Sequence, residues 1–153
     1  ELAHAKTEGA TVICGGQRAK AGSDMFFQPT IVACPSPDLR IVDTELFGPV
    51  VTVLRFKDEA DAIRLANRSE HGLAAGIFTR ASARSLRVAK AVKAGIIWVN
   101  TYRAVSPVAQ FGGMKNSGYG RESGYQAVCD YTRPKTVWVN TSDAPLGSQF
   151  VAR

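Results

Sequence analysis

A carboxylate and an aromatic ring stand two residues apart, ahead of a Gly-Pro pair. Glu45 and Phe47 precede Gly48-Pro49, and a strongly apolar segment rich in β-branched residues, Val50–Phe56, follows. The Gly-Pro pair fixes the backbone turn at this point. A buried strand does not need an acid at its mouth. Residues held there by a rigid turn are therefore predicted to meet a ligand.

A second segment with chemical potential is the glycine-rich stretch from Phe111 to Gly124. It follows Asn100, and the whole connection 101–120 shows little periodicity, which is uncommon in a compact domain unless the loop is functional. The spacing Gly118-x-Gly120-x-x-x-Gly124 differs from the phosphate-binding G-x-G-x-x-G, and no strand directly precedes it. The glycines favour tight turns and close backbone approach instead. No Gly-x-Ser-x-Gly elbow is present, which argues against a serine hydrolase.

The elements that must position these residues alternate between helical and strand character, which predicts an α/β architecture with a largely parallel sheet. Residues 50–100 read as strand, helix, strand, helix and strand, so two successive crossover units are expected. The strand over 50–56 should be buried. The helix over 82–94 should end at Gly95, with Gly95 in the left-handed conformation. The expected helices cover 1–8, 58–68, 82–94 and 124–131, and the expected strands 11–14, 26–27 with 30–32, 50–56, 73–79, 95–100 and 135–141.

Length and composition describe one ordinary globular domain. The chain has 153 residues, 45% of them hydrophobic and 21% charged, as in soluble proteins. No apolar run approaches the roughly 20 residues of a membrane span, so no membrane association is expected. The chain opens on Glu1 without an initiator Met or an apolar leader, which indicates a piece of a longer protein.

The metal-binding residue types are few and scattered. The three cysteines, Cys14, Cys34 and Cys129, form no close pair, so a zinc site is not expected. We interpret them as free thiols in a reducing, cytoplasmic setting. His4 and His71 have no Cys neighbours and are interpreted as surface or packing residues.

The net charge of +6 raises a nucleic-acid hypothesis, because no acidic residue lies between Glu70 and Glu122. Five basic residues there recur at steps of three and four along one helical face. Leu86, Ala89 and Val92 give the same helix an apolar face, and no aromatic residues are interleaved to stack bases. A solvated surface helix is therefore favoured over a nucleic-acid site. The basic residues are Arg80, Arg84, Arg87, Lys90 and Lys93.

Several motifs in order give the chain a family resemblance. Glu45-x-Phe47-Gly48-Pro49, the apolar 95–100 ending in Trp-Val-Asn, and the Phe111–Gly124 block together resemble the C-terminal portion of an aldehyde dehydrogenase. The resemblance runs from Glu1 to about Thr141. It implies that residues 1–131 are part of a three-layer, parallel-sheet catalytic domain, and that 132–153 contain an oligomerisation strand and tail.

The resemblance also implies roles for four residues. Glu45 would bind the hydroxyls of the nicotinamide ribose, since a carboxylate can accept two hydrogen bonds from a cis-diol. Phe47 would lie against the nicotinamide end of an NAD or NADP cofactor, while Phe111 and Val105 would border the aldehyde pocket. Partners implied are a small-molecule aldehyde and further copies of the chain, as a homodimer or homotetramer.

The family mechanism lies partly outside this chain. In the family a cysteine thiolate attacks the aldehyde to give a thiohemiacetal, hydride passes to the nicotinamide, and a glutamate-activated water hydrolyses the thioester. No cysteine here matches the nucleophile's surroundings, so the segment alone should be inactive. Gln110 replaces a common Pro and Val105 is smaller than some relatives' aromatics, which leaves the aldehyde open. Lys115, Arg121 and Glu122 are interpreted as holding the loop together. The alternative is a non-catalytic binding protein derived from the same fold.

Overall fold

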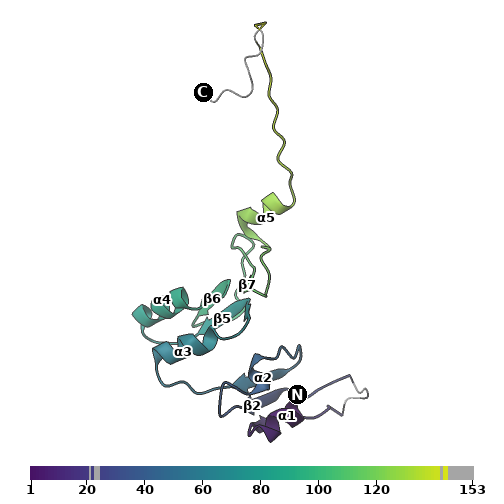
Figure 1. Ribbon diagram of the computed structural model, residues 1–153, viewed down its shortest axis with the longest axis vertical. Coiled ribbons are helices and arrows are strands. Elements are labelled where there is room, and N and C mark those ends of the chain that lie inside the picture. Colours follow the sequence, from purple (N-terminus) through teal and green to yellow (C-terminus); the bar gives the residue numbers. More distant parts are fainter. Residues whose placement is uncertain (21, 23–24, 142, 145–153) are drawn as a thin grey trace.

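The computed structural model describes residues 1–20, 22, 25–141 and 143–144. Figure 1 shows two groups of elements followed by an extended C-terminal segment. The helices are α1 (Leu2–Thr7), α2 (Arg40–Asp43), α3 (Glu59–Ala66), α4 (Ser82–Ala91) and α5 (Gly124–Asp130). The strands are β1 (Thr11–Cys14), β2 (Thr30–Ala33), β3 (Val50–Val53), β4 (His71–Gly72), β5 (Ala74–Ile77), β6 (Ile96–Val99) and β7 (Met114–Lys115).

The first group is a three-stranded sheet in the order β1-β2-β3 with α1 and α2 beside it. β1 is antiparallel to β2, and β2 is parallel to β3 with Thr30 opposite Val50. Their inward side chains form the main apolar core of the described residues, with Val32 at its centre and fully buried. The core members are Ala5, Ala10, Val32, Cys34, Leu39 and Ile41.

The second group contains the crossover unit β5–α4–β6, whose strands are parallel with Ala74 opposite Ile96. α4 packs against both strands, and α3 packs against α4. α3 begins where the Asp58 side chain accepts a hydrogen bond from the Asp61 backbone at 2.9 Å, an N-cap that satisfies one free amide. A short antiparallel pair, β4 with β7, ties the glycine-rich loop to this group.

The predicted α/β character is confirmed, but two expectations about the sheet are wrong. Within residues 50–100 only β5–α4–β6 forms a parallel crossover unit, because β3 lies in a different sheet from β5 and pairs in parallel with β2 across α2 instead. β3 is also not fully buried, with Val51 60% and Val53 44% exposed. One face of β3 is half-buried, through Val50 and Thr52, and the other face carries no further layer from the described residues.

The expectation for Gly95 is also wrong. α4 ends at Ala91, followed by Val92 in extended conformation, and Gly95 is not among the glycines with positive φ. Gly95 instead allows close packing, since a Cβ there would overlap the carbonyl oxygen of Gly112 and lie 2.8 Å from its carbon. The sequence also gave no sign of α2, a single turn of four residues.

The C-terminal segment differs from its predicted strand. The structure describes all of 135–141, yet no strand is assigned there, and these residues run extended and exposed beyond α5 (Figure 1). A strand requires a neighbouring strand for its hydrogen bonds, and none of the described strands lies beside this segment. Most of the predicted polar stretches 20–24 and 142–153 lie outside the described residues. None of the described helices could cross a membrane.

Candidate functional site

Glu45 and Phe47 lie together on the connection between α2 and β3. Both line a hollow of 280 Å³ whose walls come from α2 and the first residues of β3. Glu45 is exposed, and Phe47 is 95% exposed, so the apolar ring contacts almost nothing in this chain. The Gly48-Pro49 turn behind them is anchored to the sheet, because the Pro49 carbonyl accepts the Thr30 backbone N–H at 2.8 Å.

Phe47 combines exposure with backbone strain. Its φ is 48°, in the left-handed region that costs a residue with a side chain roughly 1–2 kcal/mol. A bulky residue rarely adopts this conformation, and strained backbone concentrates at functional sites. An aromatic ring that is held in a strained conformation and left in solvent is not explained by packing, which favours a ligand-facing role.

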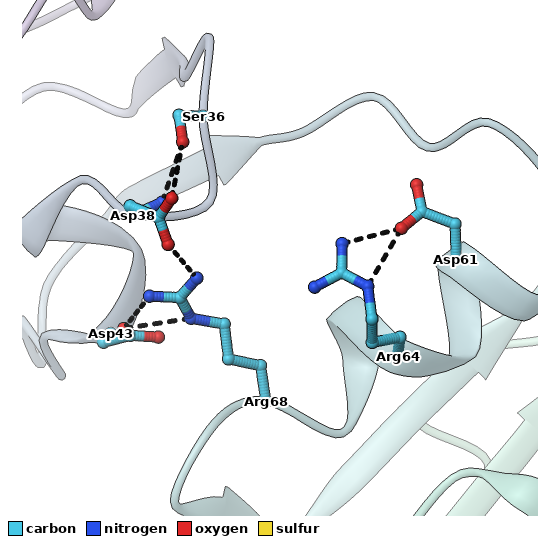
Figure 2. A network of polar contacts seen from close by, with 6 residues as sticks. All are labelled: Ser36, Asp38, Asp43, Asp61, Arg64 and Arg68. Carbon is cyan, nitrogen blue, oxygen red and sulfur yellow. Dashed lines mark hydrogen bonds and ion pairs between the residues drawn. The ribbon is translucent and has the colours of Figure 1, made fainter.

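Arg68 links the second group of elements to α2, the helix that precedes Glu45. Its guanidinium donates to Asp38 Oδ1 at 2.6 Å and twice to Asp43 Oδ2, at 2.9 and 3.2 Å (Figure 2). Arg68, followed by the Ser36 hydroxyl, holds the pKa of the Asp38 carboxyl below its usual range. Asp38 and Asp43 raise the pKa of Arg68 in return. Asp43 is the last residue of α2, two before Glu45.

His71 is a further neighbour of the site. Its Nε2 lies 3.5 Å from Glu45 Oε2, although the sequence indicated only a surface or packing role. Neither His71 nor Arg68 was identified from the sequence. Both lie more than twenty residues from their partners, so no local spacing pattern could have found them.

Val105 and Phe111 line a second hollow, of 420 Å³. Phe111 is held by a two-way backbone bridge with Glu122, each N–H donating to the other carbonyl at 2.7 Å. Gln110 adds an amide to the same lining, where it packs against Gly124. The structure therefore brings each predicted pair together, but the Glu45 and Phe47 hollow and this one have no lining residue in common.

The loop that forms this second hollow is firmly tied down. The Trp98 indole donates to the Ala104 carbonyl at 2.7 Å and packs edge-on to Tyr102. Lys115 Nζ donates to the carbonyls of Asn67 and Ser69 at 3.0 and 2.8 Å, which confirms its predicted loop-holding role. Of the five described non-glycine residues with positive φ, four lie between 100 and 123. These four are Asn100, Arg103, Lys115 and Ser123.

No cysteine lines either hollow. Cys34 is buried in the core, and burial raises the pKa of its thiol, with Glu8 adding to the effect, which disfavours the nucleophilic thiolate. Within the described part of the chain, no three His, Cys, Asp or Glu side chains are grouped to hold a metal ion. On the basic face of α4, Arg84 and Arg87 both pair with Glu59 of α3, at 3.2 and 2.9 Å.

The parallel strand pairs and the helices that connect them define a protein of the α/β class. The aldehyde dehydrogenase family profile matches residues 2–137, which is nearly the whole chain. The chain therefore belongs to the aldehyde dehydrogenase family.

Individual relatives agree with this assignment. (Z)-2-((N-methylformamido)methylene)-5-hydroxybutyrolactone dehydrogenase of Acinetobacter baylyi is 47% identical over 147 residues, or 95% of this chain and 30% of the relative. An aldehyde dehydrogenase of Emericella nidulans is 45% identical over 92% of this chain and 28% of its own length. This chain thus spans about 30% of the curated relatives it matches.

Solved structures show the same fold. The NAD+ complex of an aldehyde dehydrogenase from Bacillus cereus has a TM-score of 0.85 and 44% identity, covering 92% of this chain and 28% of that one. An apo betaine aldehyde dehydrogenase from Staphylococcus aureus, a G234S mutant, has a TM-score of 0.86 and 39% identity, covering 99% of this chain and 30% of that one. The α/β fold is therefore that of aldehyde dehydrogenases.

Proposed function

We propose that this chain supplies the nicotinamide-ribose residues and part of the aldehyde pocket of an NAD(P)-dependent aldehyde dehydrogenase. The observation that carries the proposal is Phe47, an exposed aromatic held in a strained conformation two residues from an exposed carboxylate. The Bacillus cereus relative was solved as an NAD+ complex, which supports a nicotinamide cofactor. A non-catalytic protein of the same fold would have no use for this strain.

The residues of the first hollow fit such a cofactor. The Glu45 carboxylate is open to solvent and can accept hydrogen bonds from two neighbouring hydroxyls, each worth roughly 1.5–3 kcal/mol when one partner is charged. The Phe47 ring can cover one face of a flat heterocycle and limit where it sits. When bound, the nicotinamide supplies a hydride acceptor.

The second hollow supplies a wall for the aldehyde. Val105 and Phe111 provide apolar surface and Gln110 adds a hydrogen-bonding amide, so we propose a substrate with both apolar and polar parts. The reacting thiol and the water-activating glutamate would come from elsewhere in the protein, since this chain spans about 30% of its relatives. The three free thiols favour a reducing, cytoplasmic setting.

The test is Glu45→Gln in the natural-length protein. The substitution removes the charge and one acceptor, so we expect the dissociation constant for NAD+ or NADP+ to rise by about tenfold or hydride transfer to slow by a similar factor. Calorimetric titration and single-turnover absorbance of the reduced nicotinamide measure the two. Glu8→Gln, an exposed carboxylate beside α1, is the matched control. Unchanged binding and transfer in Glu45→Gln would refute the assigned role.

We also propose that the extended segment 135–141 pairs with another copy of the chain. Val137, Trp138 and Val139 are 69%, 92% and 75% exposed, and an extended apolar segment without a strand partner is a template for pairing. This supports a homodimer or homotetramer as the working form.

A further inference from the structure

A single side chain of the second group holds both ends of the short helix that precedes Glu45. Arg68 lies two residues beyond the end of α3 and contacts Asp38, just before α2, and Asp43, the last residue of α2 (Figure 2). The three donor–acceptor distances are 2.6, 2.9 and 3.2 Å. A planar guanidinium that binds two carboxylates fixes their relative positions more strictly than a point charge does.

α2 depends on such outside support. It has four residues and no side-chain hydrogen bond at its N-cap, and a single helical turn is unstable in isolation because nucleation is unfavourable. Glu45 and Phe47 follow it within four residues, so a shift of α2 would move the backbone that carries both side chains. His71, three residues after Arg68 and the first residue of β4, adds a second contact, 3.5 Å from Glu45.

We propose that Arg68 is a positioning residue that orients the Glu45 carboxylate toward the cofactor ribose by fixing α2. The proposal rests on the proposed function, since it assumes that Glu45 binds the cofactor. Arg68 itself contacts neither hollow, so it acts through Asp43 and the turn that follows.

The chain offers a matched control on the same helix. Arg64 donates to Asp61 Oδ1 at 2.7 and 3.1 Å (Figure 2). This pair has similar geometry, but both of its residues belong to α3, so it joins no separate elements. Arg64→Gln therefore measures the loss of an ion pair alone, whereas Arg68→Gln also removes the connection to α2.

The experiment measures NAD+ and NADP+ dissociation constants in the natural-length protein for Arg68→Gln, Arg64→Gln, Glu45→Gln and the Arg68→Gln/Glu45→Gln double variant. We expect Arg68→Gln to weaken binding by roughly three- to tenfold and Arg64→Gln to leave it unchanged. In the Glu45→Gln background, Arg68→Gln should add nothing, because its effect passes through the carboxylate. If Arg68→Gln does not fold, Asp43→Asn removes the negative charge from the acceptor of two of the same three hydrogen bonds and should also weaken binding.

The outcomes separate this proposal from the one on which it rests. An additive loss in the double variant, or equal losses for Arg68→Gln and Arg64→Gln, would show a purely structural role and overturn the proposal while the cofactor assignment stands. Unchanged binding in Arg68→Gln or Asp43→Asn would do the same. If Glu45→Gln itself has no effect, the proposed function fails first, and the positioning role fails with it.

Discussion

The close approach of Gly95 to Gly112 constrains the loop that forms the second hollow, the proposed aldehyde pocket. An alanine Cβ at Gly95 would overlap the Gly112 carbonyl oxygen and lie 2.8 Å from its carbonyl carbon, whereas ordinary van der Waals contact begins at 3.4 Å. The carbon alone must then move by about 0.6 Å, and the oxygen by more. Gly112 follows Phe111 directly, so Phe111 must shift with it.

Gly95→Ala should therefore affect stability and substrate binding together. Overpacking of this kind costs about 1–3 kcal/mol of unfolding free energy. Since a displacement of about 1 Å can cost as much as a hundredfold, we expect the KM for aldehyde to rise roughly tenfold. Denaturant unfolding and steady-state kinetics of the natural-length protein measure both quantities.

Gly120→Ala is the control for this prediction. Gly120 lies in the same loop, has no positive φ, and nothing lies within 4 Å of an added Cβ. Its stability should change by less than about 0.5 kcal/mol. If Gly95→Ala unfolds at the same midpoint as Gly120→Ala and retains its KM, the steric argument is refuted.

Two further predictions concern Phe47 and the C-terminal segment. Phe47→Gly should raise the free energy of unfolding by about 0.5–1 kcal/mol, because glycine tolerates φ 48°, while weakening NAD+ binding. Denaturant unfolding and calorimetry test this, and a destabilised variant would contradict the strain argument. Val137→Lys with Val139→Lys should reduce the sedimenting mass of the natural-length protein, since buried lysines disfavour strand pairing. An unchanged oligomer would exclude pairing through this segment.

Local patterns predicted the elements whose stability is local. The strand 11–14 has the predicted bounds, and the helices over 58–68 and 124–131 are correct to within two residues at each end, because capping residues and apolar periodicity lie within the elements themselves. α2 was missed because it has four residues and no capping side chain. Its support comes from distant residues, through the burial of Ile41 in the core and through the ion pairs with Arg68. Gly95 was misinterpreted because a glycine required for close packing looks the same in sequence as one required for positive φ.

In the candidate site, too, the sequence predicts what nearby residues determine and misses what distant contacts determine. Each predicted pair lies within a few residues in sequence, and each pair lines one hollow. Their supports come from elsewhere in the chain: Arg68 binds Asp43 of α2, ahead of the first pair, and Glu122 bonds to the Phe111 backbone. Sequence spacing identifies side chains with suitable chemistry, whereas the contacts that orient them depend on how the two groups of elements meet.

One short segment, residues 68–72, makes contacts with the elements of both hollows. Arg68 binds Asp43 of α2, and His71 lies beside Glu45 while its backbone pairs with Lys115 of the glycine-rich loop. Gly72 has no room for a side chain, because a Cβ would lie 2.5 Å from the Lys93 carbonyl. The segment thus contacts the turn of the first hollow on one side and the loop of the second on the other. The proposed hydride transfer requires the two hollows to be held in fixed register, and among the described residues the 68–72 segment contacts elements that belong to both.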